Sequence, residues 1–172
     1  MNELQFSAPW CRSLRWVSVL AGGLLFLLPF GIRAGAGGLW IDDWPLVLGI
    51  LGPWGLLFGC GCFAVRGYAL DRGELRIRRW LWTTRKSLHG LRDARWDPAA
   101  IRGAWRVAGN GGLFSFSGYF RNRVLGWQRW WVTDPALAVV LDFGARIWVV
   151  SPGDPAAFVA ALGFSRNTDK KA

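Results

Sequence analysis

The chain contains little of the material that acid–base or metal chemistry requires. Its 172 residues include 11 acidic residues, one histidine, His89, and three cysteines, Cys11, Cys60 and Cys62. An odd number of cysteines is not a disulfide framework, and none of the three has the spacing of a zinc site. His89 precedes a glycine and is interpreted as a turn residue. We therefore expect no metal site, no cofactor and no enzymatic activity.

Acidic residues are also too few to balance the basic ones, which leaves a net charge of +10. The excess is confined to residues 66–172, with 18 Lys or Arg and 8 Asp or Glu, whereas residues 1–65 hold three of each sign. Hydrophobic residues make up 52% of the chain and include 13 tryptophans, which excludes a disordered protein. The sequence thus divides into an apolar first part and a basic second part.

Charge is absent from two long apolar runs, residues 16–32 and 45–65. As helices they would measure about 26 Å and about 31 Å, close to the hydrocarbon thickness of a bilayer. Pro53 is expected to kink or interrupt the second helix, while Gly55 and Gly59 would let another helix approach closely. We predict a transmembrane hairpin over residues 16–66, with residues 33–44 as an outer loop and residues 1–15 as an N-terminal tail.

The charges beside these runs predict the orientation of the hairpin. The loop carries Asp42 and Asp43, whereas arginines flank the outer ends of both runs. Positive residues favour the cytoplasmic side, so both termini are expected in the cytoplasm. The alternative is a cleaved signal peptide over residues 1–36, because Ala34-Gly35-Ala36 resembles a cleavage site. Arg33, immediately before that site, disfavours this alternative.

From residue 67 onward, short segments alternate apolar and polar residues, which is typical of strands with one buried face. Leu75 and Ile77, for example, alternate with Arg76 and Arg78. Turn residues separate these segments. Strands are predicted at residues 67–70, 74–80, 84–88, 91–96, 104–107, 113–120, 126–133, 138–143 and 146–150.

The end of the basic part predicts a helix over residues 156–162. Asp154 is typical of an N-cap, and Pro155 suits the first helical position. Phe158 would lie on the apolar face and cover the core of the sheets. We predict one domain over residues 67–164, followed by a polar tail at residues 165–172.

A glycine-rich block, Gly109-Asn110-Gly111-Gly112, is expected to be a structural turn with positive φ angles. It is not interpreted as a phosphate loop, because it lacks the lysine of that motif and precedes a strand-like segment. The block continues as GNGGLFSFSGYF at residues 109–120, and the domain ends with SPGDPAAF at residues 151–158. Together these motifs resemble the bacterial pleckstrin-homology-like (PH-like) domain family, in the version that follows two N-terminal membrane helices.

The resemblance covers about residues 67–163 and implies a mainly β fold. The expected fold is a bent antiparallel barrel of about seven strands capped by a C-terminal helix. It also implies a bacterial protein, and with the predicted hairpin this indicates the inner membrane. The family resemblance implies little about activity, since this fold hosts many binding roles.

Basic residues beside aromatic ones are the candidate membrane-facing or lipid-facing groups, because cations near a membrane surface are attracted to anionic lipid. The alternative is that these charges only set topology and solubility. Nucleic acid is not expected as a partner, since no known nucleic-acid-binding signature is present. The candidates are Arg76, Arg78, Arg79, Arg85, Lys86, Arg121, Arg123 and Arg129.

These observations favour a non-enzymatic protein that presents its PH-like domain as a protein-binding or scaffold module at the membrane face. The alternative is a sensor of anionic lipid headgroups or of a small ligand. A protein partner is expected at an exposed strand edge or a tryptophan-bearing surface.

Overall fold

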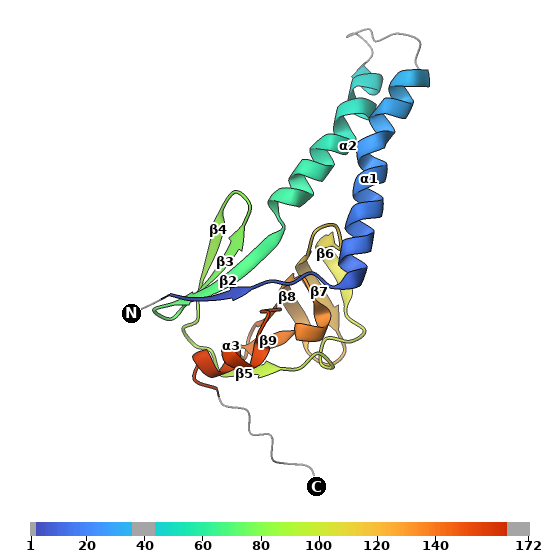
Figure 1. Ribbon diagram of the computed structural model, residues 1–172. Helices are drawn as coiled ribbons and strands as arrows, with labels where there is room; N and C mark the ends of the chain where they lie inside the picture. The colour runs from blue at the N-terminus through green and yellow to red at the C-terminus, as the bar shows by residue number, and fades with distance from the viewer. Residues whose placement is uncertain (1–2, 36–43, 165–172) are drawn as a thin grey trace.

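The computed structural model describes residues 3–35 and 44–164. Two helices, α1 (Arg12–Gly35) and α2 (Trp44–Cys62), project side by side from one end of a β-rich domain (Figure 1). The indole Nε1 of Trp54 donates to the carbonyl of Phe26 at 3.2 Å and links the two helices. The predicted polar tail and the loop acids Asp42 and Asp43 lie outside the described residues.

The second helix differs in two ways from its prediction. It continues through Pro53, so an interruption there was wrong. It also ends at Cys62, and Val65 belongs to the first strand of the domain instead of the helix. Val65 is fully buried in the domain core, which accounts for an apolar residue that the sequence pattern assigned to the membrane.

Among the described residues, ten strands form two sheets. The smaller sheet has the order β1-β2-β3-β4 and the larger the order β5-β9-β10-β8-β7-β6. The bounds are β1 Leu4–Ser7, β2 Val65–Asp71, β3 Glu74–Arg79, β4 Thr83–Ser87, β5 Asp93–Trp96, β6 Trp105–Gly111, β7 Phe116–Asn122, β8 Gly126–Val132, β9 Val139–Asp142 and β10 Ile147–Val150.

A mainly β domain with a C-terminal helix is confirmed, but the antiparallel barrel of about seven strands is wrong in two respects. The strands are more numerous and form two separate sheets. In addition, β10 pairs with β8 in parallel. After β8 the chain passes through a 3-10 turn, Pro135–Leu137, and forms β9, which is not adjacent to β8 in the sheet. Strand β10 then lies between β9 and β8. The β9–β10 hairpin therefore returns to β8 in the same direction.

The main core lies between the two sheets and is closed by helix α3 (Pro155–Ala161). Asp154 caps this helix, because its carboxylate accepts a hydrogen bond from the backbone N–H of Ala157 at 2.9 Å. Phe158 is fully buried, and its ring centroid lies 5.0 Å from that of Phe6 and 6.4 Å from that of Tyr68. The C-terminal helix thus covers the core that β1 and β2 also line.

Tyr68 connects the two sheets through its hydroxyl. The hydroxyl donates to the carbonyl of Trp131 in β8 at 2.5 Å and accepts from the backbone N–H of Ser151 at 3.2 Å. Burial raises the pKa of Tyr68 to about 12, although its hydrogen bonds with Ser151 act in the opposite direction. The neutral phenol is therefore part of the folded core.

The predicted N-terminal tail contains a strand instead. Strand β1 pairs antiparallel with β2, with Phe6 opposite Tyr68 and Ser7 opposite Gly67. The backbone N–H of Gly153 also donates to the carbonyl of Ser7 at 2.8 Å. The domain is therefore assembled from segments on both sides of the helical hairpin, since β1 precedes α1 and β2 follows α2.

The base of the hairpin is held against the larger sheet. The backbone N–H of Cys11 donates to the carbonyl of Thr133 at 3.2 Å. In the first turns of α1, the buried hydroxyl of Ser18 accepts from the backbone N–H of Phe114 at 2.9 Å. These contacts fix the start of α1 to the β6–β7 turn and the end of β8.

The glycine-rich block is only partly a turn, which corrects its prediction. Gly109, Asn110 and Gly111 belong to β6 and pair with β7. Gly109 lies opposite Gly118, both have positive φ angles, and a Cβ on either would overlap the backbone of the other strand. The turn begins at Gly112. The glycines thus allow close approach of two strands, while the reversal lies further along the chain.

Candidate functional site

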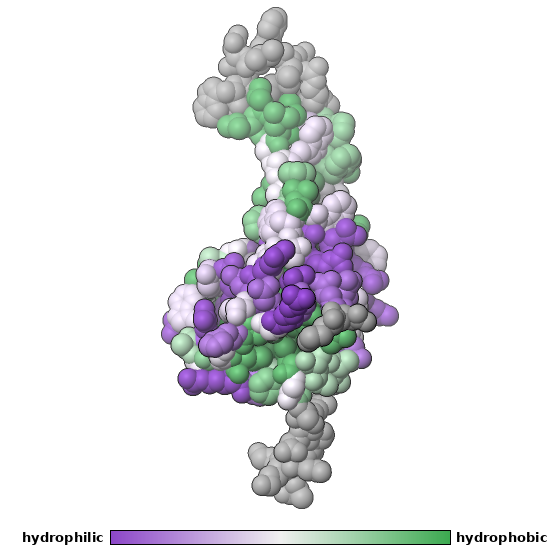
Figure 2. All heavy atoms as spheres, turned by 90° about the vertical axis from the view of Figure 1, so that its left-hand side faces the viewer, coloured by the Kyte–Doolittle hydropathy of each residue, from purple (hydrophilic) through white to green (hydrophobic). Residues whose placement is uncertain are grey.

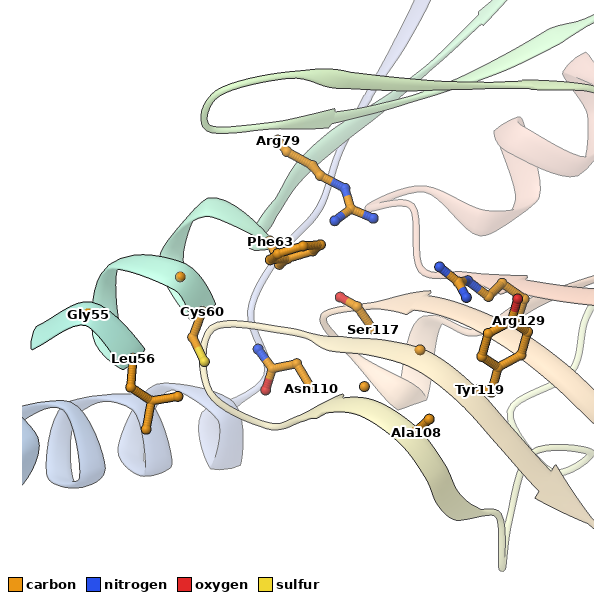
Figure 3. A pocket seen from close by; sticks show the side chains of 13 residues that line it. Gly55, Leu56, Cys60, Phe63, Arg79, Ala108, Asn110, Ser117, Tyr119 and Arg129 are labelled. Atoms are coloured by element: carbon orange, nitrogen blue, oxygen red, sulfur yellow. The ribbon is translucent and has the colours of Figure 1, made fainter. Parts of the chain in front are cut away.

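A cavity of about 490 Å³ lies where the end of α2 meets the face of β6, β7 and β8 (Figure 3). One wall is the last two turns of α2 and the residue that follows them, and the opposite wall is the sheet. Its lining consists of Gly55, Leu56, Gly59, Cys60, Phe63, Arg79, Ala108, Gly109, Asn110, Ser117, Gly118, Tyr119 and Arg129.

Glycine keeps the helical wall of this cavity open. Gly55 and Gly59 are four residues apart and therefore lie on one face of α2. A Cβ added at either position would meet no heavy atom within 4 Å, so this side is open space. Leu56, Cys60 and Phe63 complete a largely apolar wall.

Arg79, at the end of β3, brings a positive charge into the cavity (Figure 3). Its guanidinium carbon lies 5.2 Å from the ring centroid of Phe63 and 5.6 Å from that of Trp82. Within the described part of the chain, its buried Nε and Nη1 atoms have no hydrogen-bond partner. Burial and the charge of Arg129 lower the pKa of Arg79.

Arg129, in β8, brings a second positive charge from the opposite wall. Its guanidinium carbon lies 4.3 Å from the ring centroid of Tyr119 and 5.5 Å from that of Trp131. No acidic residue lines the cavity. The four ion pairs within residues 3–35 and 44–164 involve Arg76 and Arg95, so neither cavity arginine is neutralised by a described carboxylate.

Two further polar side chains of the cavity, Asn110 and Ser117, have partners within the fold. Asn110 accepts from the backbone N–H of Leu113 at 3.1 Å and donates to the carbonyl of the same residue. The hydroxyl of Ser117 pairs with that of Ser115 at 2.7 Å. The two guanidinium groups are the charged groups of this site, and neither has a carboxylate partner among the described residues.

The predicted basic candidates do not form one patch. Arg76 forms ion pairs with Asp71 at 2.7 Å and Glu3 at 3.3 Å, and Arg78 donates to the side chain of Gln5 at 3.0 Å. These two arginines thus hold the β1 segment and the β2–β3 hairpin together.

The remaining candidates are spread along the sheets. Arg85 and Lys86 lie in β4, and Arg123 is exposed in the β7–β8 turn. Arg121 stacks over Trp127 at 5.7 Å. Lys86 lines a second groove beside Arg129, with Arg146 on the same groove. Of the eight candidates, only Arg79 and Arg129 share the cavity at α2.

Sequence reasoning named both cavity arginines but missed the cavity and its apolar wall. Arg79 and Arg129 lie on strands of different sheets, and no local pattern indicates that they meet. Phe63 was counted as part of a membrane span, although it lies at the junction with the domain. The glycine pair in α2 was the available signal, since it marks a bare helix face.

Among residues 3–35 and 44–164, no three His, Cys, Asp or Glu side chains lie together in a group that could hold a metal ion. Cys11, Cys60 and Cys62 are free.

Comparison with known proteins gives one family. Neither the curated proteins nor the solved structures yield a match. A family model described as "Bacterial PH domain" matches residues 66–164, which is more than half of the chain. The matched segment begins one residue after the start of β2 and extends past the end of α3. The chain therefore belongs to the bacterial PH domain family.

Proposed function

We propose that the protein is an integral membrane protein whose helical hairpin anchors a non-enzymatic PH-like binding module at the cytoplasmic face of the bacterial inner membrane. The observation that carries this proposal is the exposure of large apolar side chains along α1 and α2. Figure 2 displays an apolar hairpin above a domain surface on which hydrophilic side chains gather. The exposed set on the helices includes Trp16, Val19, Leu20, Leu24, Phe26, Leu27, Phe30, Leu48, Leu51, Leu56 and Phe58.

By length and hydropathy, one described helix, Arg12–Ile32, is able to cross a membrane, and Val47–Cys62 is a shorter apolar helix. The pairing of β1 with β2 couples the membrane crossing of α1 to that of α2. β1 precedes α1 and β2 follows α2, yet both lie in one sheet and therefore on one side of any membrane. The two helices together must cross an even number of times. If α1 spans the bilayer, α2 must return across it.

Charge supports the proposed orientation. Arg12 and Arg15 stand at the start of α1, and Arg66 stands just beyond α2, whereas Asp42 and Asp43 occur between the helices. The positive-inside rule then assigns the domain side to the cytoplasm. The contacts of Cys11 and Ser18 with the domain favour a retained first helix over a cleaved signal peptide.

The β3–β4 turn supports the same placement. It carries Trp80 and Leu81, which are 68% and 65% exposed, and Trp82. Figure 1 displays this turn on the side of the domain from which the helices project. Tryptophan is enriched at membrane interfaces because its ring is apolar and its N–H is polar. The turn is therefore suited to the headgroup region of the same leaflet.

Strand β6 is the candidate docking edge for a protein partner. It ends the larger sheet, and six of its seven residues are exposed. Trp105 and Val107 on β6, together with Tyr119 and Trp127 on neighbouring strands, expose aromatic or apolar side chains. An exposed edge beside an apolar surface suits a partner that adds a strand. We propose that a protein binds there, and the alternative ligand is an anionic lipid headgroup.

Site-specific photo-crosslinking in living cells tests this docking edge. A crosslinking amino acid at Val107 should trap a discrete protein adduct, whereas the same amino acid at exposed Arg72, in the β2–β3 turn, should not. Equal adducts at both positions, or none at Val107, would contradict a partner at the β6 edge. Alkaline carbonate extraction in the same cells tests the anchor, because an integral protein remains with the membrane pellet.

A further inference from the structure

Arg79 is the most unusual charged group in the described part of the chain. Two of its three guanidinium nitrogens are buried without a hydrogen-bond partner. Burying a charge without hydrogen bonds is costly, and such groups are normally paired with an opposite charge. Stacking on Phe63 and Trp82 satisfies the face of the guanidinium but not its N–H donors. The N–H donors at the edge of the guanidinium therefore require a hydrogen-bond acceptor that enters from the cavity.

Arg129 strengthens this requirement. It faces the same cavity from the other wall, and its charge contributes to the lowered pKa of Arg79. Two positive charges that repel each other across a shared space are both stabilised by one anion placed between them. Guanidinium groups match the geometry of phosphate oxygens, to which they donate paired hydrogen bonds.

The remaining wall indicates what the anion is attached to. It is formed by Gly55, Leu56, Gly59 and Cys60, at the domain end of the apolar hairpin. This bare helical face continues into the exposed apolar surface of α2, where Leu48 and Leu51 lie. A soluble anion would gain no apolar contact from such a wall, whereas a lipid would place an acyl chain along it.

We propose that the cavity binds an anionic phospholipid, with the phosphate between Arg79 and Arg129 and an acyl chain along the glycine face of α2. The volume of about 490 Å³ falls within the range of small-molecule sites. Arg76 and Arg78 are not part of this site, because their side chains already contact Glu3, Asp71 and Gln5. This inference deepens the alternative of an anionic lipid ligand, because it assigns the lipid to this cavity and names the residues that contact its phosphate and its acyl chain.

The test uses the full chain in micelles of an uncharged detergent, so that lipid binding is measured separately from membrane topology. The probe is a fluorescent phosphatidylglycerol, and its affinity is measured by fluorescence anisotropy. Loss of one charge-assisted contact is expected to weaken binding roughly tenfold in Arg79→Gln and in Arg129→Gln. Arg123→Gln removes an exposed arginine of the same domain and should change the affinity less than about twofold.

Two further arms identify the source of the phosphate. Gly59→Leu fills the open helical wall and should weaken phosphatidylglycerol binding without affecting the arginines. Inorganic phosphate should compete only weakly, because it cannot use that wall. The lipid assignment is overturned if inorganic phosphate binds as tightly as the lipid and Gly59→Leu has no effect. The site itself is overturned if both cavity variants bind the lipid like the unmodified chain, or if Arg123→Gln loses as much.

Discussion

Leu24 in α1 is 67% exposed, whereas Phe158 in α3 is fully buried. The two residues represent two regions that are rich in hydrophobic side chains but use them differently. In the β domain these side chains pack between two sheets and a capping helix. In the hairpin most point away from the protein. Composition alone cannot distinguish these cases, because the difference lies in whether the fold supplies a covering surface.

The regions also differ in how they depend on each other. The hairpin is one continuous stretch of chain. The domain is not, because β1 precedes the hairpin in the sequence while its partner β2 follows it. Phe6 in β1 packs on Phe158, so excising the domain at residue 67 would remove part of its core. The hairpin is thus an insertion into the domain as well as its proposed anchor.

The largest expected effect is the loss of the side chain of Phe158. Phe158→Ala should destabilise the folded domain by roughly 3–5 kcal/mol, because it leaves a cavity where Phe6 and Tyr68 meet. Chemical denaturation of the full chain in detergent measures this change. Leu24→Ala is the matched variant on the hairpin and should cost less than about 1 kcal/mol. Similar losses in both variants would mean that the two regions bury apolar residues alike.

Adding a positive charge to each region should reverse the order of the two effects, with the larger loss in the hairpin. Leu24→Arg places a cation on the proposed lipid-facing surface, which costs about 2.5–3.5 kcal/mol near the centre of a membrane helix. Val124→Arg adds the same charge at a position that is 72% exposed on the β domain and should be tolerated. Carbonate extraction reports the fraction that remains in the membrane. Undiminished retention of Leu24→Arg would contradict a lipid-facing α1.

The pH dependence of the stability of the fold tests the burial of Tyr68 in the domain core. Its pKa is raised to about 12, so the neutral phenol stabilises the fold fully below the unfolded value near 10, and this contribution is lost as the pH rises toward 12. The full shift corresponds to about 3 kcal/mol. Denaturation between pH 9 and pH 12, compared with Tyr68→Phe, isolates this loss. A parallel pH dependence in both proteins would mean that Tyr68 is not buried.

The smallest expected effect concerns the β3–β4 turn. A fluorophore on Leu81→Cys, in a chain without its native cysteines, should be quenched by a nitroxide placed at the lipid headgroup. The same fluorophore on Arg72→Cys should be quenched less, since β3 separates the two turns by about 20 Å. Stronger quenching at Arg72→Cys would place the opposite end of the domain against the membrane.

Local sequence patterns predicted the elements that local physics determines. Leu75 and Ile77 are buried and Arg76 and Arg78 are more exposed, as their alternation indicates. The C-terminal helix begins after Asp154, whose side chain accepts a hydrogen bond from the free backbone N–H of Ala157. These elements of the mainly β domain could therefore be predicted from short segments of sequence.

Elements that depend on partners distant in the sequence could not be predicted from local patterns. Residues 4–7 form a strand because β2, some 60 residues later, offers an edge. Gly109 lies within a strand because Gly118 also lacks a side chain and lets the two backbones approach. Arg79 and Arg129 meet only after the two sheets have packed. In each case the deciding partner is remote in sequence.

The most direct test of the account is the accessibility of single cysteines to a membrane-impermeant maleimide in intact bacterial cells. In a chain without its native cysteines, Asp42→Cys should be labelled, while Gln5→Cys and Arg72→Cys should react only after the membrane is permeabilised. Gln5 and Arg72 must behave alike, because β1 and β2 share one sheet. Labelling of Gln5→Cys and Arg72→Cys in intact cells, or protection of Asp42→Cys, would contradict the two-span hairpin and its orientation.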